Sequence, residues 1–401
     1  MPLSSRRTVY LLSLAELLGM SVWFSASAVV PALTREWGLS PAGQAWLTMA
    51  VQLGFVIGAF GSALLNLADR IPGPRLFSIS SFVAAAVTVL IPVFSRGVDS
   101  AVLLRFLAGV SLAGVYPVGM KIMTTWTLEN RGWGIGLLVG SLTVGSAAPH
   151  LIRAIGGVSD WRTVLYFSAA LVALGGLIAC LFLKEGPYRA VSPKFDWRYA
   201  GRIWREPAVV LANVGYFGHM WELYAMWTWS PVFLISSFKL SGIQDRWASL
   251  AGFAIIAGGG AGCLIAGKLA DRYGRTSVTI ASLAVSGICS LAVGFLFGGS
   301  PFWLFMLCLL WGLSVVADSA QFSAGISELC PSERTGTALT LQTSLGFLLT
   351  IVTIRLIPSL ERILTWRWAF ALLAIGPAVG IWAMIILRGL PESAKMACGR
   401  R

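Results

Sequence analysis

Long apolar segments recur along almost the whole chain, and each is long enough to cross a lipid bilayer. A transmembrane helix needs roughly 20 mostly apolar residues. Twelve segments meet this length, at about residues 9–33, 44–66, 76–94, 101–122, 133–154, 162–184, 207–235, 247–270, 276–298, 301–326, 335–357 and 366–388. Only 12% of the 401 residues are charged and 57% are hydrophobic, whereas soluble domains are roughly 25% charged. The sequence therefore predicts an all-α membrane protein with twelve transmembrane helices.

The second half of the sequence repeats features of the first half. The segment 66–70 (NLADR) recurs as 267–272 (GKLADR), and Trp161-Arg162 recurs as Trp366-Arg367. The matching pairs keep nearly the same spacing and lie at the edges of apolar segments, so they indicate an internal duplication. We predict two six-helix repeats, with an N-terminal bundle over 1–184, a linker over 185–206, a C-terminal bundle over 207–390 and a tail over 391–401.

The distribution of lysine and arginine predicts the orientation of the chain. The formal net charge is +13, and the basic residues are concentrated in the loops on the side of the two termini, including the linker. The positive-inside rule places that side in the cytoplasm. We therefore expect a multi-pass protein of the inner (plasma) membrane with membrane lipids as partners, and we attribute the charge to topology rather than to nucleic-acid binding. The linker composition also favours a short amphipathic helix near residues 197–204.

Several motifs resemble those of the major facilitator superfamily. The segment 267–275 (GKLADRYGR) resembles the superfamily's loop signature between the eighth and ninth spans. Its counterpart after the second span departs from the signature, with Asn66 in place of the leading glycine and Pro72 inserted. The segment 105–109 (RFLAG) resembles the fourth-span motif, and 366–370 (WRWAF) resembles the start of the twelfth span. The resemblance covers the whole chain and implies a transporter whose first, fourth, seventh and tenth spans line a central cavity.

The two loop copies also suggest a cytoplasmic latch. An acidic side chain at a helix start accepts unpaired backbone N–H groups and faces the positive end of the helix dipole. Neighbouring arginines can pair with carboxylates or helix C-termini of the opposite half. The predicted latch comprises Asp69, Arg70, Asp271, Arg272 and Arg275. The alternative is that these residues only fix the topology and the loop shape.

Four ionisable residues fall one in each of the four spans that the resemblance assigns to the cavity. They are Glu16, Arg105, Glu222 and Asp318. A charge at the bilayer centre costs roughly 2.5–3.5 kcal/mol on insertion scales, so each is a candidate for substrate or proton binding. Glu16 and Asp318 lie at depths that would let them approach each other across the halves. Arg105 lies nearer the outer end, where bracing of helix-end carbonyls is favoured over substrate contact.

The seventh span carries a second ionisable group beside Glu222. His219 precedes Glu222 by three residues, so the two side chains share one helical face. An imidazole beside a carboxylate near mid-membrane can accept, hold and pass a proton, and a purely stabilising hydrogen bond is the alternative. Trp221 and Tyr224 are predicted to form a cavity wall or gate.

Other residues of the spans have simpler interpretations. Trp227 and Trp229 are predicted to belong to the aromatic belt at the outer membrane surface. Buried amides are predicted to form helix–helix hydrogen bonds, at Gln52, Asn213, Gln321 and Gln342. None of the six cysteines falls in a predicted external loop, so free thiols are expected. No spacing of cysteine and histidine suits a metal site, and neither a metal nor a cofactor is predicted.

Together these features predict a secondary active transporter that works by alternating access, and no enzyme. No phosphate-binding loop of the ATPase type is present. Proton coupling fits the buried carboxylates. The predicted substrate is a small organic or inorganic anion, because Arg105 and His219 supply positive groups, and the protein is expected to be monomeric. Export of amphipathic drugs or metabolites is one alternative, since the cavity would hold three acidic groups. A non-transporting sensor or assembly factor on the same fold is another.

Overall fold

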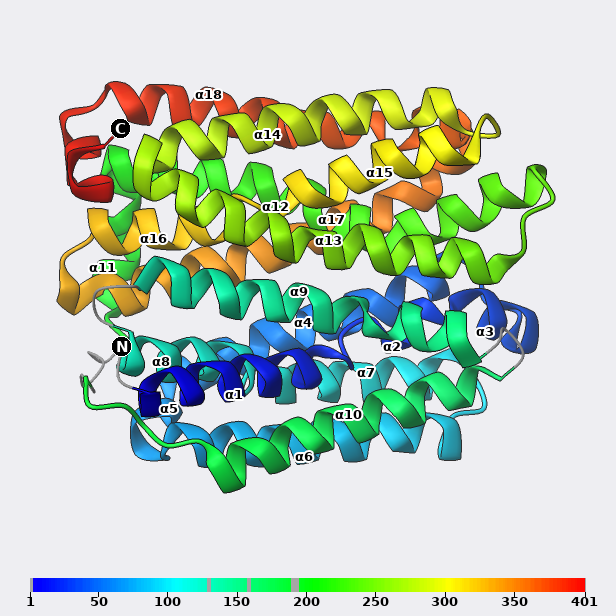
Figure 1. The fold of residues 1–401 in the computed structure, drawn as a ribbon, viewed down its shortest axis with the longest axis horizontal. Helices are drawn as coiled ribbons and strands as arrows, with labels where there is room; N and C mark the ends of the chain where they lie inside the picture. The colour runs from blue at the N-terminus through cyan, green and yellow to red at the C-terminus, as the bar shows by residue number, and fades with distance from the viewer. Residues whose placement is uncertain (1–2, 128–130, 157–159, 189–194, 401) are drawn as a thin grey trace.

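The computed structural model describes residues 3–127, 131–156, 160–188 and 195–400. Helices and short 3-10 turns connected by loops make up this part of the chain, with no strand in the described ranges (Figure 1). The first half contains α1 (Leu3–Met20), α2 (Ser25–Ala28), α3 (Val30–Trp37), α4 (Pro41–Leu64), α5 (Leu67–Arg70), α6 (Gly73–Phe94), α7 (Val98–Leu112), α8 (Tyr116–Trp126), α9 (Arg131–Gly156) and α10 (Trp161–Phe182).

The second half follows a short connecting helix. The elements are α11 (Trp197–Arg202), η1 (Ile203–Arg205), α12 (Pro207–Leu240), α13 (Asp245–Tyr273), α14 (Arg275–Ala292), η2 (Val293–Leu296), α15 (Pro301–Val315), α16 (Ser319–Leu329), α17 (Ser332–Ala369), η3 (Ala371–Ala374), α18 (Ile375–Gly389) and η4 (Pro391–Gly399). The two halves lie side by side, and both chain termini lie at the same end of the molecule (Figure 1). We call this end the terminal end and the opposite end the distal end.

Ten helical stretches of the described residues are long and apolar enough to cross a membrane. Two of the twelve predicted spans are not among these ten. The first is interrupted, because α1 is followed by α2 and α3, and the seventh corresponds to α12. Both carry buried polar groups, Glu16 in α1 and His219 with Glu222 in α12, which lower their mean hydropathy. Both segments that fall outside the ten thus carry candidate functional residues.

The fourth and tenth predicted spans are broken at corresponding points of the two repeats. Helix α7 ends at Leu112 and α8 begins at Tyr116, while α15 ends at Val315 and α16 begins at Ser319. The Cys263 thiol of α13 donates to the carbonyl of Val316 in the second break, at 3.3 Å. Irregular backbone at membrane depth is tolerated where protein covers it or where it lines a cavity, which is typical of transporter binding sites.

The most extensive contacts between the halves are those of α9 with α13 and of α4 with α17. Helices α9 and α13 cross at a pair of glycines. A Cβ atom on Gly140 would lie 3.2 Å from the carbonyl oxygen of Gly260, and one on Gly260 would lie 3.0 Å from the carbonyl oxygen of Gly140. The absence of side chains therefore allows the two backbones to touch, as small residues commonly do in membrane helix pairs.

The connection between the halves contains the predicted short helix. Asp196 caps α11, because its carboxylate accepts from the backbone N–H groups of Arg198 and Tyr199 at 2.9 and 3.2 Å. The Tyr199 ring is buried and its hydroxyl donates to Cys330 at 3.4 Å. These contacts dock the helix on the second half. Part of the predicted linker, residues 189–194, lies outside the described residues.

Candidate functional site

A cavity of about 290 Å³ lies between the two halves near the terminal end. Its lining alternates small apolar residues with hydroxyl and amide groups, and Asp69 is its acidic residue. From the first half come Ala59, Ser62, Ala63, Asn66, Ala68, Asp69, Ala113, Tyr116, Pro117 and Met120; from the linker Phe195; and from the second half Ser323, Gly336, Thr337, Leu339, Thr340 and Thr343. Ala113 lies in the break of the fourth span, and Tyr116 and Pro117 are the first residues of α8 after it, so the backbone at this break lines the cavity.

Aromatic rings from both halves fill the space toward the distal end. We call this set the aromatic cluster: Trp23, Phe24 and Phe55 from the first half, and Tyr224, Trp227 and Phe347 from the second half. The ring centroids of Phe55 and Phe347 are 4.7 Å apart, and those of Trp23 and Tyr224 are 5.9 Å apart. All six side chains are buried. Contacts of this kind hold the halves together on the distal side of the cavity.

Three tryptophans of α12 do not occupy the positions predicted for them. Trp227 and Trp229 are only 1% and 3% exposed, so the prediction of an aromatic belt at the membrane surface was wrong for both. Trp229 donates its indole N–H to the carbonyl of Ile354 at 2.9 Å. Trp221 donates to the carbonyl of Leu372 at 3.3 Å and packs against Gly376, away from the cavity. Of the predicted cavity-wall pair, only Tyr224 lies at the boundary between the halves.

His219 is paired with Asp318 and not with Glu222. The Nδ1 atom of His219 lies 2.8 Å from Oδ1 of Asp318, and each side chain is 1% exposed. The two atoms do not form an aligned hydrogen bond, so the contact is electrostatic. Asp318 stands in the break of the tenth span, where the chain leaves α15. The break brings the carboxylate to the imidazole of α12, which corrects the predicted pairing within α12.

Glu222 instead forms a separate network inside the second half. Its carboxylate accepts from the indole N–H of Trp311 at 2.7 Å and from the hydroxyl of Ser286 at 2.8 Å. These partners come from α15 and α14. Both carboxylate oxygens are thereby satisfied, as burial requires. This favours a stabilising role for Glu222, with partners other than the predicted His219.

Tyr216 connects the cavity with the His219–Asp318 pair. Its phenol group is adjacent to the side chain of Thr343, which lines the cavity. Its ring centroid lies 6.0 Å from that of His219. The sequence analysis did not single out Tyr216. The signal was present, because Tyr216 precedes His219 by three residues and so lies on the same face of α12.

Glu16 lies fully buried in the first half. A Cβ atom on Gly119 would lie 2.5 Å from Oε2 of Glu16, so the glycine of α8 provides the space for the carboxylate. Neither carboxylate oxygen has a hydrogen-bond partner among the described residues. Glu16 thus packs closely against Gly119 of its own half. In the described part of the chain, no contact joins Glu16 to Asp318 across the two halves.

Two buried amides on the helices that join the halves lack the predicted helix–helix hydrogen bonds. The side-chain nitrogen and oxygen of Gln52 in α4 and of Gln342 in α17 have no partner among residues that the structure describes. Phe55 and Phe347, which touch across the boundary, lie close to them along the same helices. Buried amides without partners are costly, so these two groups are candidates for ligand contact.

Arg105 is enclosed by the interruption of the first span. Its guanidinium donates to the carbonyl of Val22 at 2.8 Å, to the carbonyl of Trp23 and to the hydroxyl of Ser25 at 3.2 Å. Its Nε donates to the carbonyl of Leu47 in α4, at 3.2 Å. The break leaves backbone carbonyls without helical N–H donors, and the buried Arg105 supplies donors to them. Arg105 therefore braces helix-end carbonyls, as the sequence favoured.

Two of the predicted latch residues, Asp69 and Arg275, each form an ion pair within their own half. Asp69 pairs with Lys121 of α8. Arg275 forms a two-pronged ion pair with Glu328 of α16, at 2.7 and 2.5 Å, and donates to Gln321 at 2.8 Å.

The other latch residues lie at the surface of the terminal end. Arg70 is exposed, the guanidinium of Arg272 lies 5.2 Å from the ring centroid of Tyr273, and the backbone carbonyl of Asp271 accepts from Arg400. A latch between the halves therefore remains a prediction for a conformation with that end closed.

Comparison with known proteins identifies the family. The family model for the Major Facilitator Superfamily matches residues 12–354. The chain is 28% identical over 248 residues to a putative niacin/nicotinamide transporter of Bacillus subtilis, covering 60% of this chain and 61% of that protein. It is 31% identical over 151 residues to a 4-hydroxybenzoate transporter of Pseudomonas aeruginosa, covering 37% and 32% respectively. These alignments thus span less than two thirds of either relative.

A solved structure has the same fold over nearly the full length. It is a bacterial homolog of the human lysosomal transporter Spinster in an inward-facing and unoccupied conformation, with a TM-score of 0.66, 16% identity and 98% of both chains covered. Because the family model matches most of its length, this chain belongs to the major facilitator superfamily of membrane transporters.

Proposed function

We propose that the protein carries a small aromatic or other organic anion together with protons across the inner membrane. In this proposal the cavity between the halves holds the substrate, and the His219–Asp318 pair holds the coupling proton. The chain crosses the membrane twelve times, as two six-helix bundles over 1–184 and 207–390, with the terminal end in the cytoplasm. The cavity then faces the cytoplasm while the aromatic cluster closes the other side.

The position of the His219–Asp318 pair carries the proposal. With a neutral imidazole, the pair has the single negative charge of Asp318, and it becomes neutral when His219 binds a proton. A bound anion in the neighbouring cavity is therefore repelled less when the proton is present. By linkage, the anion raises the affinity for the proton by the same factor. Tyr216 provides the physical connection, because its phenol group is adjacent to Thr343 of the cavity and its ring lies beside the imidazole of His219.

The cavity lining suits a small aromatic carboxylate. The rings of Tyr116 and Phe195 offer flat apolar surfaces, while Thr337, Thr340 and Thr343 offer hydroxyl donors. The N-terminal turn of α8 begins at Tyr116 and directs the positive end of the helix dipole toward the cavity. Relatives of the chain are named as transporters of niacin, 4-hydroxybenzoate and gallate, and these compounds are the first substrates to test.

Transport in proteoliposomes with an imposed pH gradient tests the proposal. With one proton carried per monovalent anion, transport moves no net charge, and a difference of about one pH unit sustains about tenfold accumulation. Asp318→Asn should abolish accumulation yet keep exchange of labelled for unlabelled substrate, because the cavity remains. Glu222→Gln is the matched control, since its network lies inside the second half. It should lower the melting temperature but keep coupled transport. Accumulation by Asp318→Asn equal to that of the unchanged protein would refute the coupling role.

Export of amphipathic compounds is a second candidate. The chain is 25% identical over 291 residues to the multidrug resistance protein MdtG of Enterobacter lignolyticus, covering 70% of this chain. The same proteoliposomes distinguish the two, because an exporter would use the pH gradient to move lipophilic dyes away from the cytoplasmic side. Dye movement without accumulation of any aromatic acid would favour this second function.

A further inference from the structure

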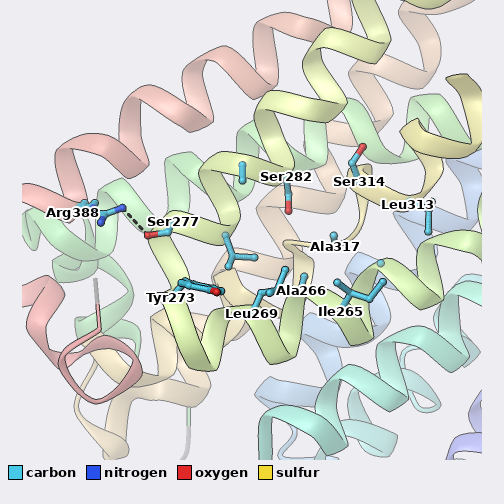
Figure 2. A pocket seen from close by; sticks show the side chains of 13 residues that line it. Ile265, Ala266, Leu269, Tyr273, Ser277, Ser282, Leu313, Ser314, Ala317 and Arg388 are labelled. Atoms are coloured by element: carbon cyan, nitrogen blue, oxygen red, sulfur yellow. Dashed lines mark hydrogen bonds between the residues drawn. The ribbon is translucent and has the colours of Figure 1, made fainter.

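A second cavity lies outside the boundary between the halves, on the surface of the second half that faces the bilayer. It is a groove of about 630 Å³ between α13, α14, α15 and α18 (Figure 2). Its walls are mainly apolar, and three of the lining residues on α13 are largely exposed on the outer surface: Ile265, Leu269 and Tyr273 at 56%, 41% and 54%.

The polar groups of the groove are unevenly placed. Arg388 is the only charged residue among those that line it, and its guanidinium donates to the Ser277 hydroxyl at 2.6 Å. Both residues lie at the terminal end of the groove, with Tyr273 nearby (Figure 2). The last turns of α13 carry two exposed basic side chains at this end, Lys268 and Arg272, and one exposed acidic side chain, Asp271. The groove is thus apolar along its length and positively charged at one end.

The length of the groove matches one leaflet of a bilayer. Its α13 wall runs from Tyr273 to Gly262, which is about 16 Å at the helical rise of 1.5 Å per residue. The hydrocarbon core of a bilayer is about 30 Å thick, so one leaflet contributes about 15 Å. The inner end of the groove is formed by Leu313, Ser314 and Ala317, which flank or belong to the break that carries Asp318.

We propose that this groove binds an anionic phospholipid of the leaflet at the terminal end. One acyl chain lies along Ile265, Leu269 and Ala266 and reaches the break of the tenth span. The phosphate lies at Arg388 and Ser277, where the guanidinium supplies charge complementarity to the headgroup. Apolar walls that face the bilayer are filled by acyl chain rather than by water, and an excess of basic residues at the leaflet surface favours anionic headgroups.

Native mass spectrometry of the purified full-length protein, titrated with dioleoyl phosphatidylglycerol or dioleoyl phosphatidylcholine, tests this site. The unchanged protein should bind phosphatidylglycerol more tightly. Arg388→Gln should weaken that binding about fivefold and remove the preference over phosphatidylcholine, as expected for one basic residue near the headgroup. Arg75→Gln is the matched control. Arg75 is exposed at the terminal end of the first half, and its replacement should leave the preference unchanged.

A second variant addresses the acyl chain. Ala281 lines the groove and is exposed, so Ala281→Phe should fill the groove and weaken the binding of both lipids without changing the headgroup site. Soluble glycerol phosphate, which has no acyl chain, should give no comparable binding. Equal loss of preference in Arg388→Gln and Arg75→Gln would overturn the proposal. So would glycerol phosphate binding that survives Ala281→Phe, since the groove would then hold a phosphate group and not a lipid.

Discussion

At the scale of single residues, buried polar groups are explained by partners that come from other helices. Arg105 satisfies carbonyls freed by the interruption of the first span, and Glu222 is satisfied by Trp311 and Ser286. Glu16, in contrast, is buried without such partners among the described residues. An ionised carboxylate in that position is costly. Glu16, which lacks hydrogen-bond partners, is therefore a candidate for proton binding, whereas the hydrogen-bonded Glu222 is a candidate for a structural role.

A residue-scale prediction concerns Glu36 at the distal end. The indole N–H of Trp161 donates to its carboxylate at 2.6 Å, and this hydrogen bond, with that from Arg162, holds the pKa of Glu36 below its usual value of 4.5. Because the pKa is lower in the folded protein, the stabilisation is present above about pH 4.5 and is lost as the pH falls through the lowered value.

Thermal unfolding of Glu36→Gln at a series of pH values checks this. Glu36 is 41% exposed, so its stabilising effect should stay below about 1 kcal/mol. The melting temperature of the variant should be lower than that of the unchanged protein at pH 7, and the difference should shrink at acid pH. Asp99→Asn, at the same end, is the control. A difference that grows as the pH falls would contradict the prediction.

At the scale of helices, the crossing of α9 and α13 depends on Gly140 and Gly260. The side chain of Gly260→Val would meet the backbone of Gly140. Overpacking of this kind costs about 1–3 kcal/mol, and here it would push apart two helices that join the halves. Gly260→Val should therefore lower the melting temperature and the transport rate. Gly267→Val lies on the same helix with no atom within 4 Å of its added Cβ, and it should leave both unchanged. Equal effects of the two variants on melting temperature and transport rate would show that close packing at Gly140 and Gly260 is not required.

At the scale of the whole molecule, the cavity between the halves lies near the terminal end, and the buried aromatic cluster lies on its distal side. A cysteine at Thr340, which lines the cavity, should react with a membrane-impermeant maleimide from the cytoplasmic side only. Ser100→Cys, exposed at the distal end, should react from the other side. The exposed cysteines Cys180 and Cys398 are first replaced by serine. Reaction of both new cysteines from one side of the membrane would disprove the proposed orientation.

The sequence alone determined the class of fold and the family. Apolar segments of membrane-spanning length, a repeated loop motif and rare buried charges are local features, and each is visible without knowledge of packing. The sequence also predicted which spans carry Glu16, Arg105, His219 and Asp318. It could place Glu16, Arg105 and His219 on helices because the spacing of residues along a helix is fixed, whereas Asp318 lies in the break after α15.

Only the tertiary structure decided the partners of those residues. Helix α12 is buried on nearly all sides, so helical periodicity does not tell which face of it meets the cavity. His219 and Glu222 share a face by spacing, yet the break after α15 brings Asp318 to His219, while α14 and α15 supply the partners of Glu222. Trp227 is likewise buried by rings from both halves. Contacts between segments far apart in the chain depend on how the bundles pack, and no local pattern of residues specifies that packing.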